Sequence, residues 1–186
     1  MPCANAAVGE ALDKAALNKA TPNQPTLKRL TLMVAAYLAL YALFQAAYQA
    51  LRTGGHSHWL IDQLTVAPSA ALIGSVFPGD GVWAQGSRVM WPGGSLALLA
   101  GCDGFEVLAL YLPAVLVSPV SWRRGLAMLV LGSALIWLFN QGRLLTLYAA
   151  FRYWHDGFDA LHTVWAPLLM LAMVCAFFVW NLRRAP

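Results

Sequence analysis

Four stretches of mostly apolar residues constrain this chain more than any other feature. A helix needs roughly 20 such residues to cross a bilayer. The stretches cover about residues 30–51, 105–120, 126–147 and 161–182. Hydrophobic residues make up 60% of the chain and charged residues 11%, a composition too apolar for a soluble domain. The sequence therefore predicts an all-α integral membrane protein with four transmembrane helices in the lipid bilayer.

Basic residues near the ends of these stretches predict the orientation. Eight lysines and arginines fall on one side: Lys14, Lys19, Lys28, Arg29, Arg123, Arg124, Arg183 and Arg184. Cytoplasmic segments carry such an excess, so we expect both termini in the cytoplasm. Residues 1–29 would form a polar N-terminal tail, 30–182 a single membrane domain, and 183–186 a basic C-terminus. Topology thus explains the net charge of +4, and we expect no nucleic-acid partner.

The loop between the first two stretches, about residues 52–100, is expected on the outer side of the membrane. Its part 59–77 has apolar residues at near-helical spacing, which predicts an amphipathic helix lying on the membrane face. Residues 82–90 and 95–100 flank a Pro-Gly-Gly sequence at 92–94, which predicts a small β-hairpin with a glycine-rich turn. The hairpin leads directly to Cys102.

The three cysteines differ in their surroundings. They show neither a CxxC pattern nor Cys/His ligand spacing, so we expect no disulfide framework, metal site or cofactor. Cys3 lies in the polar tail, and Cys175 lies within an apolar stretch, where a cysteine usually acts as a small apolar filler. Cys102 follows Gly101 at the outer start of the second stretch, which makes it the candidate reactive thiol.

Polar residues also occur at the outer ends of the last two stretches. Arg143 closes the sequence Asn140-Gln141-Gly142-Arg143, and an ionisable group in an apolar span costs a few kcal/mol and is usually retained for a role. Alternatively, Arg143 extends to the outer headgroups. His162 lies where the fourth stretch begins, and His155 lies in the connection before it.

These residue types fit thiol chemistry. A cysteine attacks as a thiolate, and its pKa of about 8.5 must be lowered by a base or a positive environment. His162 could take the proton and return it to a leaving amine. Arg143 could hold a substrate carbonyl and stabilise its oxyanion. Asp103 and Glu106 would oppose ionisation of the thiol unless they face away or orient the base.

In these residues the chain resembles the exosortase/archaeosortase family of membrane enzymes. The family's Cys-x-Gly motif is matched by Cys102-Asp103-Gly104, and its Asn-x-x-Arg motif in the following span is matched by Asn140 to Arg143. A histidine near the outer start of the next span is matched by His162. The order and spacing agree over about residues 82–180. Each motif alone is weak, and the ordered trio is more specific.

The resemblance implies a membrane cysteine protease, with transpeptidase capability, in the bacterial inner membrane with its active site facing the periplasm. Its substrates would be membrane-anchored exported proteins whose C-terminal sorting signal has a short motif, an apolar span and a basic tail. Cys102 would be the nucleophile, Arg143 the carbonyl or oxyanion clamp and His162 the acid/base. The chain departs from the family in having four predicted spans where many members have about eight. His155, in a His-Asp pair, is a rival for the histidine role.

A second class of function stays open. The four spans could form a non-enzymatic membrane assembly subunit, or a helical bundle that binds haem through His155 or His162. Cys102 would then merely be buried. Haem ligation between spans normally uses histidines well inside facing helices, whereas both histidines are expected near the outer surface.

Overall fold

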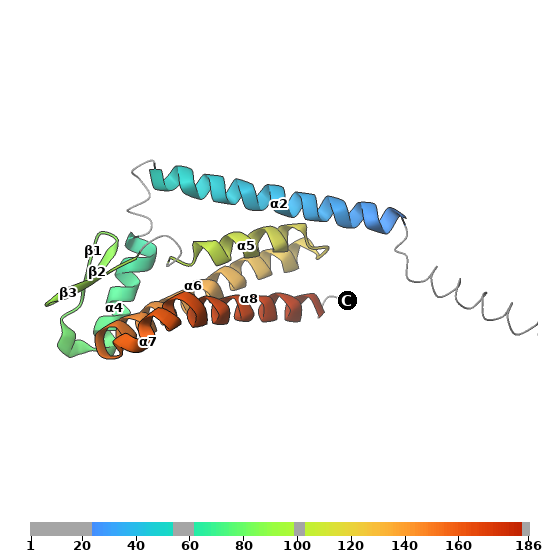
Figure 1. Cartoon of the computed structure of the whole chain (residues 1–186). Helices are drawn as coiled ribbons and strands as arrows, with labels where there is room; N and C mark the ends of the chain where they lie inside the picture. Colours follow the sequence, from blue (N-terminus) through green and yellow to red (C-terminus); the bar gives the residue numbers. More distant parts are fainter. Residues whose placement is uncertain (1–23, 54–61, 99–102, 184–186) are drawn as a thin grey trace, which may run out of the picture. The chain divides into compact units, whose positions relative to one another are not determined.

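The computed structural model describes residues 24–53, 62–98 and 103–183 (Figure 1). The chain divides into two compact units, Met1–Leu38 and Ala39–Pro186, and the boundary falls within helix α2 (Gln24–Thr53). In the first unit, the described residues form the beginning of this helix. All further elements belong to the second unit.

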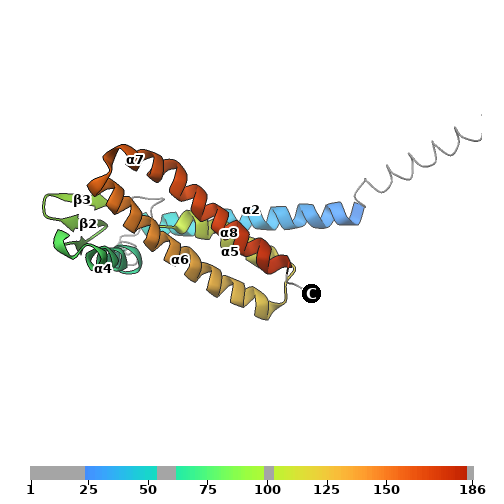
Figure 2. The same ribbon diagram turned by 90° about the horizontal axis from the view of Figure 1, so that it is seen from below.

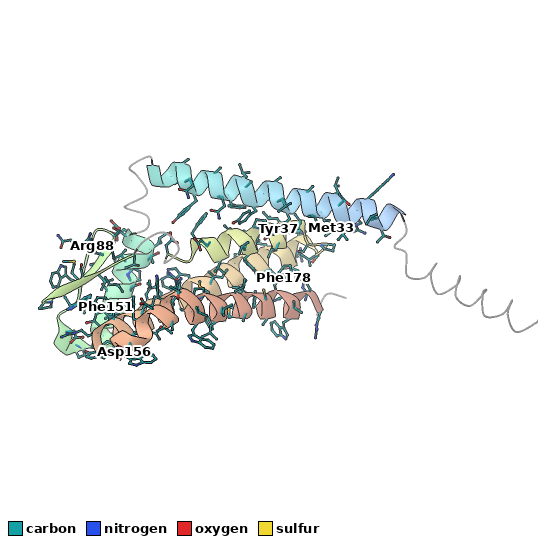
Figure 3. All side chains as sticks on the ribbon, viewed as in Figure 1. Met33, Tyr37, Arg88, Phe151, Asp156 and Phe178 are labelled. Carbon is teal, nitrogen blue, oxygen red and sulfur yellow. The ribbon has the colours of Figure 1, made fainter. Side chains whose placement is uncertain are left out.

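Three helices of the second unit pack against one another: α5 (Phe105–Val117), α6 (Trp122–Tyr153) and α8 (Ala166–Arg183) (Figures 1 and 2). Between α6 and α8 the chain forms α7 (His155–Ala160) and the π-helical turn η3 (Leu161–Trp165). Tyr111 of α5 joins the three helices, because its hydroxyl donates to Met128 O of α6 at 2.7 Å and its ring meets that of Phe178 of α8 edge-on. Phe178 is labelled in Figure 3. A Cβ at Gly132 would overlap Tyr111, so this glycine permits the close approach of α5 and α6.

The segment expected outside the membrane forms a helix and a small sheet. The helix comprises the π-helical turn η1 (Asp62–Val66) and α4 (Ala67–Val76), and the 3-10 turn η2 (Pro78–Asp80) follows. Pro68 lies in the first turn of α4, directly after the π-helical turn η1. A helix predicted over residues 59–77 is confirmed over residues 62–76, whereas its position on the membrane face stays a prediction.

The sheet is a three-stranded antiparallel meander of β1 (Trp83–Gln85), β2 (Arg88–Trp91) and β3 (Gly94–Ala97). Gln85 pairs with Arg88 and Trp91 with Gly94, so both turns have two central residues. The predicted Pro92-Gly93 turn is present, with the positive φ of 92° at Gly93 that a type II turn requires. The predicted strand over residues 82–90 is divided by a second turn at Gly86, whose φ of 53° suits the first central position of a type II′ turn.

The helix formed by η1 and α4, the sheet and the end of α6 pack together in one apolar core. Val66 and Ile73 of the helix, Val89 and Trp91 of β2, and Tyr148 of α6 are all buried in it. Trp91 meets the Tyr148 ring edge-on at 5.3 Å. We refer to this packed unit, residues 62–98, as the outer assembly. Phe151 of α6, labelled in Figure 3, also contacts Trp91, at 5.9 Å.

Three helices among the described residues are long and apolar enough to cross a membrane: Thr26–Leu51, Trp122–Tyr153 and Asp156–Arg183. They contain three of the four predicted spans and indicate a membrane protein. The remaining predicted span, residues 105–120, is the second along the chain and corresponds to α5, which has 13 residues. At 1.5 Å per residue α5 is about 20 Å long, shorter than the roughly 30 Å of bilayer hydrocarbon. A fourth span and the side on which the termini lie stay predictions.

Asp80 connects the outer assembly to α6 through hydrogen bonds. Its Oδ2 accepts hydrogen bonds from the Tyr148 hydroxyl at 2.6 Å and the Tyr153 hydroxyl at 2.8 Å. Both favour the charged carboxylate, and the bond from Tyr148, followed by that from Tyr153, lowers the pKa of Asp80 from its ordinary value of 3.8.

We expect the outer assembly to loosen in acid through Asp80. A lowered pKa means that the stabilisation is complete above the ordinary value near pH 3.8 and is lost as the pH falls through the lowered value. Asp80→Asn should therefore reduce stability at pH 7 and flatten its dependence on pH below 4. Thermal unfolding of the detergent-solubilised protein measures both effects. Asp159→Asn, at an exposed position, is the control, and equal profiles for the two variants would contradict the prediction.

Candidate functional site

The predicted nucleophile, Cys102, lies outside the described residues. The structure describes the rest of its motif, Asp103 and Gly104, at the start of α5. The Asn-x-x-Arg motif lies on α6 and His162 on η3, so the predicted residues come from successive elements of one bundle.

Gly104 and Asn140 bring the first two motifs into contact. Gly104 caps the beginning of α5 with a φ of 78°, a conformation that residues with a side chain rarely adopt. A Cβ at this position would lie 3.1 Å from Cγ of Asn140. Glycine is thus required both by the backbone conformation and by the neighbouring side chain.

The carboxylate of Asp103 accepts two hydrogen bonds. Its Oδ1 accepts the backbone N–H of Phe105 at 3.1 Å, which satisfies a donor at the start of α5. Its Oδ2 accepts the hydroxyl of Tyr48, from the end of α2. The rings of Tyr48 and Phe105 also stack, with centroids 3.8 Å apart and planes 9° from parallel. The carboxylate that was expected to oppose ionisation of a thiol is therefore engaged by two donors, while Glu106 is exposed.

Polar side chains of α6 are buried beside the outer assembly. Asn140 is 1% exposed and Gln141 5% exposed. The Ser69 hydroxyl of α4 lies 2.7 Å from Oε1 of Gln141 and 2.6 Å from the carbonyl oxygen of Thr65. Nε2 of Gln141 is buried and has no hydrogen-bond partner among the described residues, so this amide can still donate a hydrogen bond. Thr65, Ser69 and Gln141 form a polar contact between helices that are otherwise apolar.

The sequence did not single out Thr65, Ser69 or Tyr48. Thr65 and Ser69 are four residues apart and therefore share a face of the predicted helix, which is a signal that could have pointed to them. Tyr48 lies in an apolar span with several aromatic residues, and the pattern does not separate it from its neighbours.

Arg143 lies one turn beyond Asn140 on α6. Its side chain is half-buried, and its Nε is buried. This burial favours a role within the protein over extension to the outer headgroups, the alternative that the sequence left open.

His162 lies in a π-helical turn, a feature that often marks functional sites. Its ring stacks on Phe158, with centroids 5.6 Å apart and planes 8° from parallel. Phe158 in turn meets Phe151 of α6 edge-on at 5.3 Å. Nδ1 of His162 is buried and has no hydrogen-bond partner in the described part of the chain. The side chain of His155 lies outside the described residues, so the choice between the two histidines stays a prediction.

Arg143 and His162 lie on the two sides of the bend between α6 and α8. Arg143 comes about three helical turns before the bend at Trp154, and His162 about two turns after it. Because α6 packs against η3 and α8, the elements that carry the two residues lie side by side in this hairpin. Within the described ranges, no three His, Cys, Asp or Glu side chains gather in a way that could hold a metal ion.

We expect Gly104→Ala to destabilise the bundle. The left-handed conformation alone costs a residue with a side chain about 1–2 kcal/mol, and the new methyl group would also press on Asn140. Gly142→Ala is the matched control, because a Cβ there meets nothing within 4 Å and alanine favours a helix over glycine by up to about 1 kcal/mol. Thermal unfolding in detergent compares the two. A Gly104 variant as stable as the Gly142 variant would argue against the tight contact.

Comparisons of this chain with models of protein families, with curated proteins and with solved structures find no match.

Proposed function

We propose that this chain is a membrane cysteine peptidase of the exosortase type, with transpeptidase capability, that cleaves C-terminal sorting signals of exported proteins. The observation that carries the proposal is the contact between Gly104 and Asn140. It joins the segment that follows Cys102 to the segment that carries Arg143. Two motifs recognised separately in the sequence thus meet in one place, as parts of a single site must.

In the proposed reaction, the Cys102 thiol gives its proton to His162, and the thiolate attacks the carbonyl carbon of the scissile amide. The carbonyl oxygen becomes an oxyanion, which the planar guanidinium of Arg143 stabilises. When the oxyanion collapses, the C–N bond breaks and the leaving amine takes the proton from His162. Water or an acceptor amine then attacks the thioester, gives up a proton through His162, and releases the cysteine.

The surroundings of His162 and Asp103 support these roles. The stack on Phe158 fixes the plane of the His162 imidazole, and its buried Nδ1 keeps hydrogen-bonding capacity for a partner. The two carboxylate oxygens of Asp103 accept hydrogen bonds from the Tyr48 hydroxyl and from the backbone N–H at the start of α5. Its negative charge is therefore partly offset by donors, which reduces the penalty on a neighbouring thiolate.

The proposed topology has four spans, both termini in the cytoplasm, and the site at the periplasmic face of a bacterial inner membrane. The two ends of α6 support this orientation. Arg123 and Arg124 begin the helix, and Arg124 donates to the carbonyl oxygen of Asn181 near the end of α8, so the basic residues gather at one end of the bundle. Asn140 and Arg143 lie toward the opposite end, next to the outer assembly.

Cys102→Ala should abolish processing, whereas Cys175→Ala should leave it intact. Cys175 is a matched control, because it is an exposed free cysteine on α8. The substrate is a co-expressed exported protein from the same genome that ends in a short motif, an apolar span and a basic tail. Immunoblots of membrane fractions measure the shift from precursor to cleaved product. Processing by the Cys102 variant would remove this residue as nucleophile, and a Soret band in the purified protein would favour the haem-binding alternative.

Arg143→Lys should also abolish processing, because a point charge cannot reproduce the planar, multi-donor guanidinium. Between the histidines, His162→Gln should lose at least about a hundredfold in rate, the usual contribution of a general acid/base, while His155→Gln retains activity. The same immunoblot, taken over time, gives the rates, and circular dichroism checks that each variant is folded. The reverse pattern for the two histidines would transfer the acid/base role to His155.

A further inference from the structure

A cavity of about 260 Å³ adjoins the contact between the two motifs. Its walls come from the end of α2, from η1, from the start of α5 and from one face of α6. Asp103, Gly104 and Asn140 line it, so it begins beside the residue that follows Cys102 in the chain. The remaining lining residues are mostly apolar: Tyr48, Leu51, Leu64, Thr65, Phe105, Leu108, Ser133, Ile136 and Trp137.

The cavity runs from the motifs toward the middle of the bundle. On α6 it is lined by Asn140, Trp137, Ile136 and Ser133, which follow one another on a single helix face over about two turns, or about 10 Å. On the antiparallel α5 it extends in the same direction, from Gly104 to Leu108. The carboxylate of Asp103 and the amide of Asn140 therefore lie at the motif end, and Leu108, Ile136 and Ser133 line the part deeper in the bundle.

One wall of the cavity is exposed. Leu51, Leu64 and Trp137 line it, and their side chains are 52%, 56% and 42% exposed. The Trp137 indole N–H donates to the carbonyl oxygen of Leu64 at 2.7 Å, which ties η1 to α6 at this wall. Leu51 and Trp137 belong to helices that are long and apolar enough to span a membrane, so in a bilayer these two side chains would face lipid and a neighbouring membrane segment would reach the cavity from this side.

We infer that this cavity binds the first apolar side chains of the substrate's membrane-spanning segment, on the leaving-group side of the scissile bond. The inference rests on the proposed function, in which the substrate has a cleavage motif at the outer face followed by an apolar span. Such a chain is polar beside the motifs and apolar farther in, which is the order of the cavity lining. At about 30 Å³ for each water molecule, the cavity holds roughly nine, which suits one or two side chains.

Disulfide cross-linking tests the inference without catalysis. In a Cys3→Ala, Cys102→Ala, Cys175→Ala background, Ser133→Cys places a thiol in the cavity wall, and Ala134→Cys places one at the next, exposed position outside the lining. The probe is a co-expressed reporter that ends in the sorting signal and carries one cysteine at the first residue of its apolar span. Oxidation should cross-link the reporter to the Ser133 variant and not to the Ala134 variant.

The outcomes separate this inference from the proposed function. Cross-linking at neither position, or equally at both, overturns the inference, whether or not the wild-type protein processes the reporter. Processing by the wild type in that case leaves the proposed function standing. Selective cross-linking at Ser133 without processing by the wild type supports the cavity as a binding site and removes the peptidase proposal.

A size series provides a second test in the active protein. Ser133→Leu narrows the cavity, whereas Ala134→Leu adds the same bulk at an exposed position. Substrates carry alanine or leucine at the first residue of the apolar span. The Ser133 variant should process the leucine substrate at least about tenfold less well relative to the alanine substrate than the wild type does. An unchanged ratio, or the same change in the Ala134 variant, contradicts the inference.

Discussion

The close contact of Gly104 with Asn140 is the constraint on which the rest of the site depends. Gly104, at the start of α5, has a left-handed backbone conformation and no side chain, and it lies against the buried side-chain amide of Asn140 on α6. Asp103 accepts hydrogen bonds from the Tyr48 hydroxyl and from the backbone N–H of Phe105 at the start of α5, and the cavity lies beside Gly104 and Asn140. A residue with a side chain at Gly104 would be strained at this φ and would press on Asn140, at the point where the start of α5, the stack of Tyr48 on Phe105 and the cavity meet.

The outer assembly holds α6 by two different kinds of contact. Near the end of the helix, Asp80 accepts hydrogen bonds from Tyr148 and Tyr153 above a shared apolar core. Two turns earlier, Ser69 contacts Gln141 in a fully buried setting. Because Gln141 stands between Asn140 and Arg143, the assembly fixes the rotation of the helix that presents both residues. The outer assembly is therefore connected to the candidate site through α6.

The sequence predicted those helices and turns that depend on a local pattern of residues. Apolar length identified the three described helices that are long and apolar enough to span a membrane, and Pro92-Gly93 identified one of the two turns in the sheet. The turn at Gly86 was missed because a single glycine in an alternating strand does not reveal its φ. The motifs gave Asn140 and Gly104, but their contact depends on the rotation of two helices about their axes. The same is true of Ser69 with Gln141 and of Tyr48 with Asp103, which no spacing along the chain encodes.

The contact of Tyr111 with Gly132 also couples the lengths of two segments of the chain. Tyr111 lies about two turns from Gly104 along α5, and Gly132 lies about two turns from Asn140 along α6. The two helices thus touch at two points separated by nearly equal lengths. One residue inserted between the points on either helix would rotate the far point by about 100° and shift it by 1.5 Å. Both contacts can survive together only if these two segments keep their lengths, even where individual lipid-facing side chains within them change.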